Sequence, residues 1–147
     1  MVSMTSSEKK KELLKVSQIN KRVEELNAEI EMLWSQAVAI SPNTSGMPSG
    51  GISDGTKIER VVERLEKAQS QLTAEVKELH EVKYKIISAI QGLSDIRERR
   101  VLHLAYIGKV EGTKQRPLSL WKVANEMGYS YDRIRHIHGE ALLHLEL

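Results

Sequence analysis

The first forty residues carry apolar side chains at alternating intervals of three and four positions, which predicts a long helix with one buried seam. The seam positions are Val16, Ile19, Val23, Leu26, Ile30, Leu33, Ala37 and Ile40. Thr5 and Glu8 have the spacing of a capping box, so we expect the helix to begin there and to run from about Glu8 to Ile40. Pro42 is expected to end it, because the residue before a proline avoids helical geometry.

A second long helix is predicted after residues 41–55, SPNTSGMPSGGISDG, a loop with two prolines and four glycines. Thr56 and Glu59 repeat the capping-box spacing at its start. A seven-residue apolar repeat follows at Ile58, Leu65, Leu72, Leu79, Ile86 and Leu93, with Val62, Val76 and Ile90 as looser intermediate positions that Gln69 and Lys83 interrupt. This repeat predicts that the second helix also has one buried apolar seam.

Two arrangements of these helices fit the sequence. The favoured one is an antiparallel hairpin of two helices, each on the order of 50 Å long, because residues 1–94 offer no third apolar partner. The other is a parallel coiled coil between chains through the first helix, since β-branched and leucine core residues suit two strands. Both use the same seam, and both leave a homodimer through the N-terminal helices as the expected oligomer.

The last third of the chain predicts three shorter helices. The segment DIRERRVLHLAYIG (residues 95–108) follows a capping Ser94, KVEGTKQRP is predicted as a loop, and two more helices start near Leu120 and Ser130. No segment alternates with period two over enough residues to predict a strand. We therefore expect an all-α fold, with a helical hairpin at residues 1–92 and a smaller domain at residues 93–147.

The stretch SLWKVANEMGYSYDRIRHIHGEAL (residues 119–142) has the pattern of a helix-turn-helix. Ala124 is a small residue where a second helix can approach, Gly128 tolerates a left-handed backbone in the turn, and Ser130 can cap the helix that follows. The residues expected to form the core and the turn of this motif are Val123, Ala124, Met127, Gly128, Ile134 and Ile137.

Charge indicates what this motif could bind. Residues 1–94 hold 13 basic and 13 acidic side chains, whereas residues 95–147 hold 9 and 7. A recognition helix over residues 130–145 would read the major groove of DNA with its N-terminal part. Its predicted base contacts are Ser130, Tyr131, Asp132, Arg133, Arg135 and His136. The predicted phosphate contacts, which position a protein without reading sequence, are Lys109, Lys114, Arg116 and Lys122.

These segments carry a resemblance to a known module. LSDIRERRVLHLAYI followed by SLWKVANEMGYSYDRIRHIHGEALLHL resembles the C-terminal helix-turn-helix of bacterial sigma factors, their region four, which reads promoter elements. The matching features are the arginine-rich helix at residues 97–100, Ala124, the turn at residues 128–130 and the pair Ala141-Leu142. The match covers residues 93–147, and the loop GKVEGTKQRPL is longer than the sigma-type connection.

A second resemblance extends over most of the chain. The ending GYSYDRIRHIHGEAL, the long helices before it and the connection SPNTSGMPS are similar to phage-encoded regulators of the RinA/ArpU type. This resemblance implies a transcriptional regulator of phage or prophage genes, with double-stranded DNA as partner and RNA polymerase as a candidate partner. A complete sigma factor is excluded, because promoter melting needs a further domain with aromatics that catch flipped bases.

The sequence offers little that suggests catalysis. His103, His136, His138 and His144 lack the carboxylate or thiolate partners of a zinc site, and the chain has no cysteine. We find no phosphate-binding glycine loop and no nucleophile-histidine-acid pattern, so we expect neither an enzyme nor a cofactor. The start MVSMTSSEKKKELLK lacks the apolar stretch of a secretory signal, and no apolar run reaches about 20 residues. We therefore expect a cytoplasmic protein of a bacterial host cell with no membrane partner.

The sequence thus predicts a sequence-specific DNA-binding regulator and leaves two alternatives. One is a small terminase subunit, which would recognise a packaging site and form a ring through its long helices. The other is an interaction protein whose long helices dock a partner, with no role for DNA. Activation or repression, the DNA site and the oligomeric state are left open by the sequence.

Overall fold

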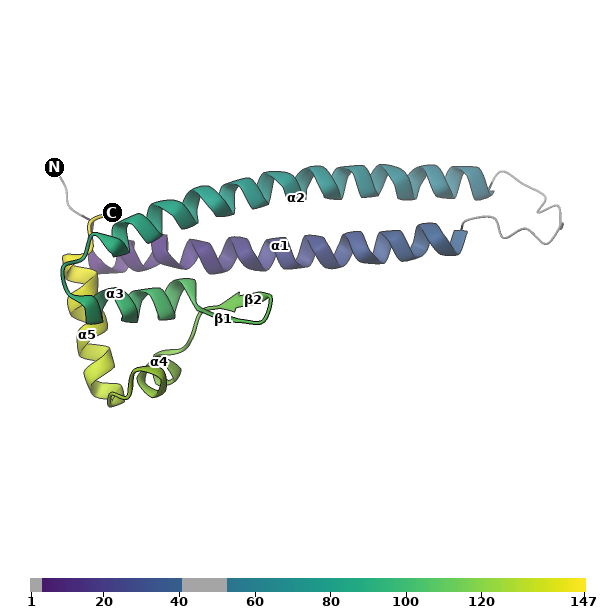
Figure 1. The fold of residues 1–147 in the computed structure, drawn as a ribbon. Helices are drawn as coiled ribbons and strands as arrows, with labels where there is room; N and C mark the ends of the chain where they lie inside the picture. Colours follow the sequence, from purple (N-terminus) through teal and green to yellow (C-terminus); the bar gives the residue numbers. More distant parts are fainter. Residues whose placement is uncertain (1–3, 41–52) are drawn as a thin grey trace. The chain divides into compact units, whose positions relative to one another are not determined.

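The computed structural model describes residues 4–40 and 53–147, which are mostly helical. In chain order the elements are α1 (Ser6–Ile40), α2 (Ser53–Gln91), α3 (Ile96–Leu102), the π-helical turn η1 (His103–Ile107), β1 (Lys109–Glu111), β2 (Lys114–Arg116), α4 (Leu120–Met127) and α5 (Tyr131–His144) (Figure 1). The helical content confirms the all-α class at the coarse level, with one small sheet added.

The chain forms two compact units. Unit 1 comprises Met1–Asn20 and Glu78–Leu147, and unit 2 comprises Lys21–Lys77. This division differs from the predicted split after residue 92. The reason is that Leu13 and Val16, near the start of α1, are buried in one core with residues from the C-terminal third of the chain.

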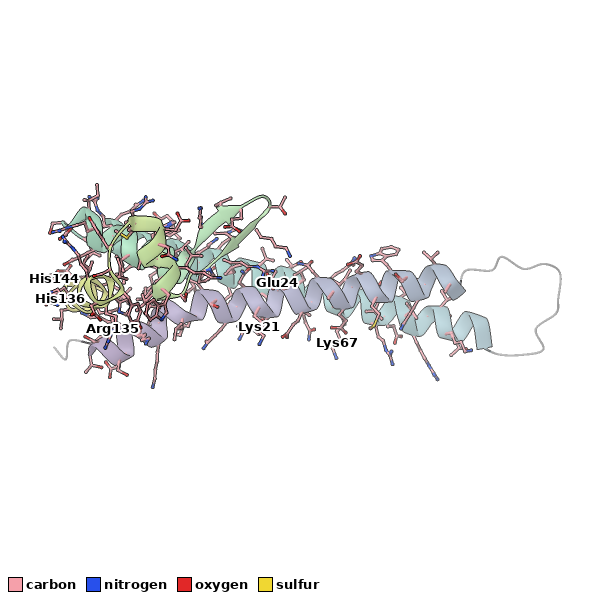
Figure 2. All side chains as sticks on the ribbon, turned by 90° about the horizontal axis from the view of Figure 1, so that it is seen from below. Lys21, Glu24, Lys67, Arg135, His136 and His144 are labelled. Carbon is pink, nitrogen blue, oxygen red and sulfur yellow. The ribbon has the colours of Figure 1, made fainter. Side chains whose placement is uncertain are left out.

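In unit 2, α1 and α2 lie side by side with opposite chain directions and share an apolar seam. Its buried residues are Leu33, Val61, Leu65 and Ala68, with Ile30 and Ala37 packed against them. Arg22 Nη2 lies 3.1 Å from Glu75 Oε2. Charged side chains such as Lys21, Glu24 and Lys67 are exposed along these helices (Figure 2).

The predicted seam of α1 is confirmed. Val16, Ile19 and Leu33 are buried, and Val23, Leu26, Ile30 and Ala37 are half-buried. The side chain of Ile40 lies outside the described residues, as do Pro42 and most of the predicted loop, residues 41–52.

The predicted intermediate positions of the α2 seam are confirmed at Ile90, which is 3% exposed, and wrong at Val62, while Val76 is half-buried. Val61 is 7% exposed, whereas the predicted Val62 is 42% exposed. Between two residues seven apart, the intermediate seam residue can lie three or four positions after the first. In α2 it lies three positions after, as at Val61 and Ala68, over most of the helix. This choice buries Ala68 in place of Gln69 and half-buries Val82, which packs against the unit 1 core.

Among the two long helices and α3, the predicted helix start is confirmed at α1 and differs at α2 and α3. At α1, the Thr5 amide donates to Glu8 Oε2 at 3.0 Å and the Glu8 amide donates to Thr5 Oγ1 at 3.2 Å, which confirms the first capping box. α2 begins at Ser53, so Thr56 and Glu59 lie inside the helix and do not cap it.

The third helix is capped by Asp95, not by the predicted Ser94. The Asp95 carboxylate accepts a hydrogen bond from the Arg97 amide at 2.8 Å. This bond is the main reason that the pKa of Asp95 lies below its ordinary value. Because a carboxylate at a helix N-terminus also interacts favourably with the helix dipole, Asp95 is the better cap of the two neighbours.

Two apolar cores organise unit 1. The first joins α1, α2, α3, η1 and α5 through Leu13, Val16, Ile86, Ile90, Leu93, Leu102, Tyr106, Ile107, Ala141, Leu142 and Leu145. The second joins α3, η1, α4 and α5 through Val101, Leu104, Val123, Ala124, Ile134 and Ile137. Lys9 Nζ, from the first turns of α1, donates to the carbonyl of Leu142 at 2.9 Å and of Leu143 at 3.3 Å, near the C-terminus of α5.

The segment predicted as a loop, residues 109–117, contains a β-hairpin. β1 and β2 pair antiparallel, with Lys109 opposite Arg116 and Glu111 opposite Lys114. The two strands have three residues each, too short for period-two alternation to show in the sequence. Lys83 Nζ donates to Gln115 Oε1 at 2.8 Å, so the lysine that interrupts the predicted α2 seam fixes the hairpin to α2.

We expect Val61→Ala and Val62→Ala to differ although the residues are neighbours. The first removes two methyl groups from a buried seam and should lower the free energy of unfolding by about 1–3 kcal/mol. The second alters an exposed position and should change it by less than about 0.5 kcal/mol. Urea denaturation followed by circular dichroism measures both, and equal losses would contradict the seam described above.

We expect Gly→Ala to change the free energy of unfolding in opposite directions at Gly108, before β1, and at Gly139, in α5. Gly108 has φ +107°, and a Cβ there would lie 2.1 Å from the backbone carbon and oxygen of Arg116. Gly108→Ala should therefore lower the free energy of unfolding by more than about 1 kcal/mol. Gly139→Ala, within α5 and with nothing in the way of a Cβ, should raise it by up to about 1 kcal/mol. Thermal unfolding of the two variants provides the comparison, and a stabilised Gly108→Ala protein would contradict it.

Candidate nucleic-acid interface

A tight turn joins α4 to α5, and three residues determine its geometry. Ser119 caps α4 by accepting from the Lys122 amide. Gly128 ends α4 in the left-handed conformation, with φ +71° and ψ +30°, which serine or tyrosine would adopt only with strain. Ser130 Oγ accepts from the Arg133 amide at 3.2 Å and caps α5. The chain therefore stops one helix and starts the next within three residues.

The predicted core residues of the α4–α5 pair lie together beneath this turn. Val123, Ala124, Ile134 and Ile137 are buried with Val101 and Leu104, and Met127 and Tyr129 pack against them half-buried. Figure 1 shows α4 beside the N-terminal part of α5. Since α5 is anchored through its inner face, the side chains of its opposite face point outward.

The residues predicted to contact bases lie on this outward face. Ser130, Asp132, Arg133, Arg135 and His136 are exposed, and Tyr131 is half-buried. Figure 2 shows Arg135 and His136 on α5. Both arginines lie near an aromatic ring: the guanidinium carbon is 4.7 Å from the Tyr129 centroid for Arg133 and 5.7 Å from the Tyr131 centroid for Arg135.

Trp121 belongs to the same surface, and sequence reasoning missed it. Its ring stacks on Tyr131, with 3.8 Å between centroids and 2° between planes. The sequence does place Trp121 two residues after Ser119, the cap of α4, and Tyr131 at the first position of α5. This placement becomes informative only when the packing of the two helices is known.

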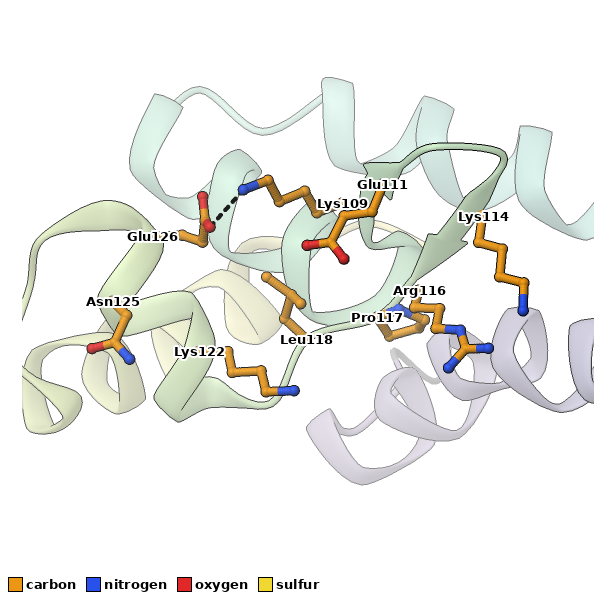
Figure 3. Close-up of a pocket in the computed structure, with 9 residues that line it drawn as sticks. All are labelled: Lys109, Glu111, Lys114, Arg116, Pro117, Leu118, Lys122, Asn125 and Glu126. Carbon is orange, nitrogen blue, oxygen red and sulfur yellow. Dashed lines mark hydrogen bonds and ion pairs between the residues drawn. The ribbon is translucent and has the colours of Figure 1, made fainter.

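The four residues predicted to contact phosphate line one hollow of about 710 Å³ (Figure 3). Lys109, Lys114 and Arg116 come from the β-hairpin and Lys122 from α4. The hollow is not uniformly basic, because Glu111 and Glu126 line it too.

Lys109 differs from the other three cations. Its Nζ lies 2.7 Å from Glu126 Oε1, and the pKa of Lys109 is raised by this hydrogen bond and ion pair. Lys114, Arg116 and Lys122 are exposed, and within the described part of the chain no ion pair or side-chain hydrogen bond occupies their charges. Lys109 therefore joins the hairpin to α4, and the other three present the free positive charge of the hollow.

The inner face of α5 carries a buried polar pair. The Tyr106 hydroxyl and His138 Nε2 are 2.7 Å apart in a hydrogen bond. Burial raises the pKa of Tyr106 to about 12 and lowers the pKa of His138, with the charge of Lys10 adding to the second effect. His144 Nδ1 lies 2.9 Å from the buried Glu98 carboxylate. Among the described residues no group of three or more histidines and acids could hold a metal ion.

No protein-family model, no curated protein and no solved structure matches this chain. In the ranges 4–40 and 53–147, none of the helices is both long and apolar enough to cross a membrane.

The buried histidine predicts a dependence of stability on pH. Because the folded state lowers the pKa of His138 below its ordinary 6.5, the unfolded chain binds more protons under mildly acidic conditions. The free energy of unfolding should therefore decrease as the pH falls through 6.5. His103, whose pKa burial also lowers, should contribute in the same direction.

Urea titrations at closely spaced pH values measure this slope. His138→Gln retains a group that can hydrogen-bond to Tyr106 but does not titrate, so the slope should decrease. His136→Gln, at an exposed position, is the matched control and should leave the slope unchanged. An undiminished slope in His138→Gln would contradict the assignment to His138.

Proposed function

We propose that this chain is a sequence-specific DNA-binding transcriptional regulator of phage or prophage genes, with a helix-turn-helix formed by α4 and α5. The observation that supports it best is the α4–Gly128–Ser130–α5 geometry, in which the inner face of α5 is buried and its N-terminal outer face presents Arg133, Arg135 and His136. A recognition helix enters the major groove with this part.

The chemistry of that face suits base readout. Arginine can donate two hydrogen bonds to O6 and N7 of guanine, which distinguishes a G·C pair from the other pairs. Contacts with Tyr129 and Tyr131 restrict the rotamers of Arg133 and Arg135, so less conformational entropy is lost on binding. Asp132 could accept from the amino group of cytosine in the same groove.

The basic hollow supports a separate role in positioning. Lys114 and Arg116 on β2 and Lys122 on α4 are exposed cations, and they would pair with backbone phosphates. Phosphate contacts release condensed counterions, so each adds to the dependence of affinity on salt. The hairpin would then fix the orientation of α5 on the duplex without contributing to base preference.

The long helices α1 and α2 would form the antiparallel hairpin through which the protein dimerises or contacts RNA polymerase. Met32, Trp34 and Val38 of α1 are exposed apolar side chains in unit 2, which supports a contact surface there. A homodimer would prefer DNA with paired half-sites, because the symmetry of the site follows that of the protein.

Selection of bound fragments from sheared bacterial and prophage DNA tests this function. The chain is incubated with the fragments and a polyanion competitor at near-physiological salt, and the recovered DNA is sequenced. Enrichment of one short motif upstream of a gene supports a sequence-specific regulator. Equal recovery of all fragments, or recovery of none, contradicts it and shifts attention to the long helices as the functional part.

Two alanine variants should separate base contacts from phosphate contacts. Arg135→Ala should reduce the preference for the selected motif over an unrelated duplex, by about 1–3 kcal/mol if the contact is bidentate. Lys114→Ala should weaken binding to both sequences alike and lower the slope of log affinity against log salt by about one. Fluorescence anisotropy of labelled duplexes across a salt series measures both quantities. Identical behaviour of the two variants would contradict this division of roles.

A further inference from the structure

Trp121 is exposed on the proposed DNA-binding surface although it is stacked. Its ring lies parallel to that of Tyr131 at 3.8 Å, which covers one of its two faces. The residue is nevertheless 64% exposed. The exposed area must therefore belong to the other face of the indole and to its edge. A large flat apolar surface is thus held open at the start of α4.

The position of this ring relates it to α5. Trp121 lies in the first turn of α4, and its stacking partner Tyr131 is the first residue of α5. The first turns of the two helices are therefore linked through these two stacked rings. Lys122 follows Trp121 in the chain, and the Arg135 guanidinium lies 5.7 Å from the Tyr131 centroid. Tyr131, in the part of α5 assigned to the groove, thus contacts both Trp121 and Arg135.

An exposed tryptophan alone would carry little weight, and Trp34 in unit 2 is such a case at 54% exposed. Trp121 differs because the stack fixes its orientation before any partner arrives. A side chain that is already ordered loses little rotamer entropy on binding. Its indole N–H is also a hydrogen-bond donor, and it has no hydrogen-bond partner within the described residues.

We infer that Trp121 contacts DNA directly, packing its open face on a deoxyribose and directing its N–H to a phosphate oxygen of the strand that borders the groove. This inference rests on the proposed function. Sugar and phosphate are the same at every nucleotide, so the contact carries no base preference. The indole is uncharged, so the contact releases no counterion of its own.

These properties give Trp121 a signature different from those of its neighbours. Trp121→Ala should weaken binding to all duplexes by the same factor, roughly tenfold for an apolar contact of this size, without changing the salt slope. Lys122→Ala should lower the salt slope by about one, and Arg135→Ala should reduce motif preference. Trp121→Phe keeps an aromatic face on Tyr131 and should recover most of the lost affinity.

Intrinsic fluorescence tests the contact directly. The chain has two tryptophans, so Trp34→Phe leaves Trp121 as the sole indole. Unlabelled duplex of unrelated sequence is titrated into this variant, and the anisotropy of a dye-labelled copy of the same duplex reports binding independently. The Trp121 emission should change in step with the anisotropy. In the reciprocal variant, Trp121→Phe, binding should leave the Trp34 emission unchanged.

Four results would overturn the inference. If no variant binds DNA by anisotropy, the proposed function fails and the Trp121 contact fails with it. If DNA binds while Trp121 emission and Trp121→Ala affinity are unchanged, only the contact fails and the regulator proposal stands. If Trp121→Ala loses motif preference as Arg135→Ala does, Trp121 is a positioning residue for Arg135. If it loses more affinity for a single-stranded oligonucleotide than for a duplex, the ring is a stacking site for unpaired bases.

Circular dichroism and thermal unfolding of Trp121→Ala separate a lost contact from a lost fold. The residue is largely exposed, so its melting temperature should stay close to that of the parent chain. If Trp121→Ala is unfolded at the assay temperature, Trp121→Phe and the emission measurement take its place in the comparison. Both keep an aromatic ring stacked on Tyr131.

Discussion

α5 is buried in both apolar cores of unit 1, and this double burial determines the direction of every side chain on the helix. Ile134 and Ile137 pack with α4, α3 and η1, while Ala141, Leu142 and Leu145 lie in the core that includes α1 and α2. Rotation of α5 by one residue would withdraw both groups from their cores at once. The outward face is therefore defined by what the inward face buries, over nearly the full length of the helix.

The hydrogen bond between Tyr106 and His138 occupies the boundary between these two groups on α5. A buried polar group without a partner costs free energy, so the bond favours one rotation of α5 over its neighbours. Apolar packing tolerates small rearrangements, whereas the 2.7 Å hydrogen bond between the Tyr106 hydroxyl and His138 Nε2 does not. The pair thus adds specificity to an arrangement whose stability comes mainly from the cores.

The sequence predicted features that depend on local spacing. The seam of α1 and its capping box follow from neighbouring residues, and the helix pair around Gly128 was recognisable from small, left-handed and capping residues in order. The α2 seam was less determinate, because Val61 and Val62 both satisfy a seven-residue repeat. Only packing against α1 decides between them, and that information is not local.

The candidate surface shows the same limit. The sequence identified four cations that line one hollow, but not the glutamates between them or the ion pair that occupies Lys109. It also left Trp121 unassigned, because the stack joins two helices through their first turns. Strands of three residues and a helix of eight leave too little periodicity for the sequence to indicate which residues they contact.

The hydrogen bond from Lys9 to the Leu142 carbonyl joins residues 133 positions apart. The core that contains both ends of the chain cannot be completed until residues 141–145 have been synthesised. α1 and α2 can form early from local interactions, but Leu13 and Val16 must wait for Ala141 and Leu142 before they are covered. Until then these side chains remain open to other partners, so the assembly of unit 1 is a late step with a high contact order.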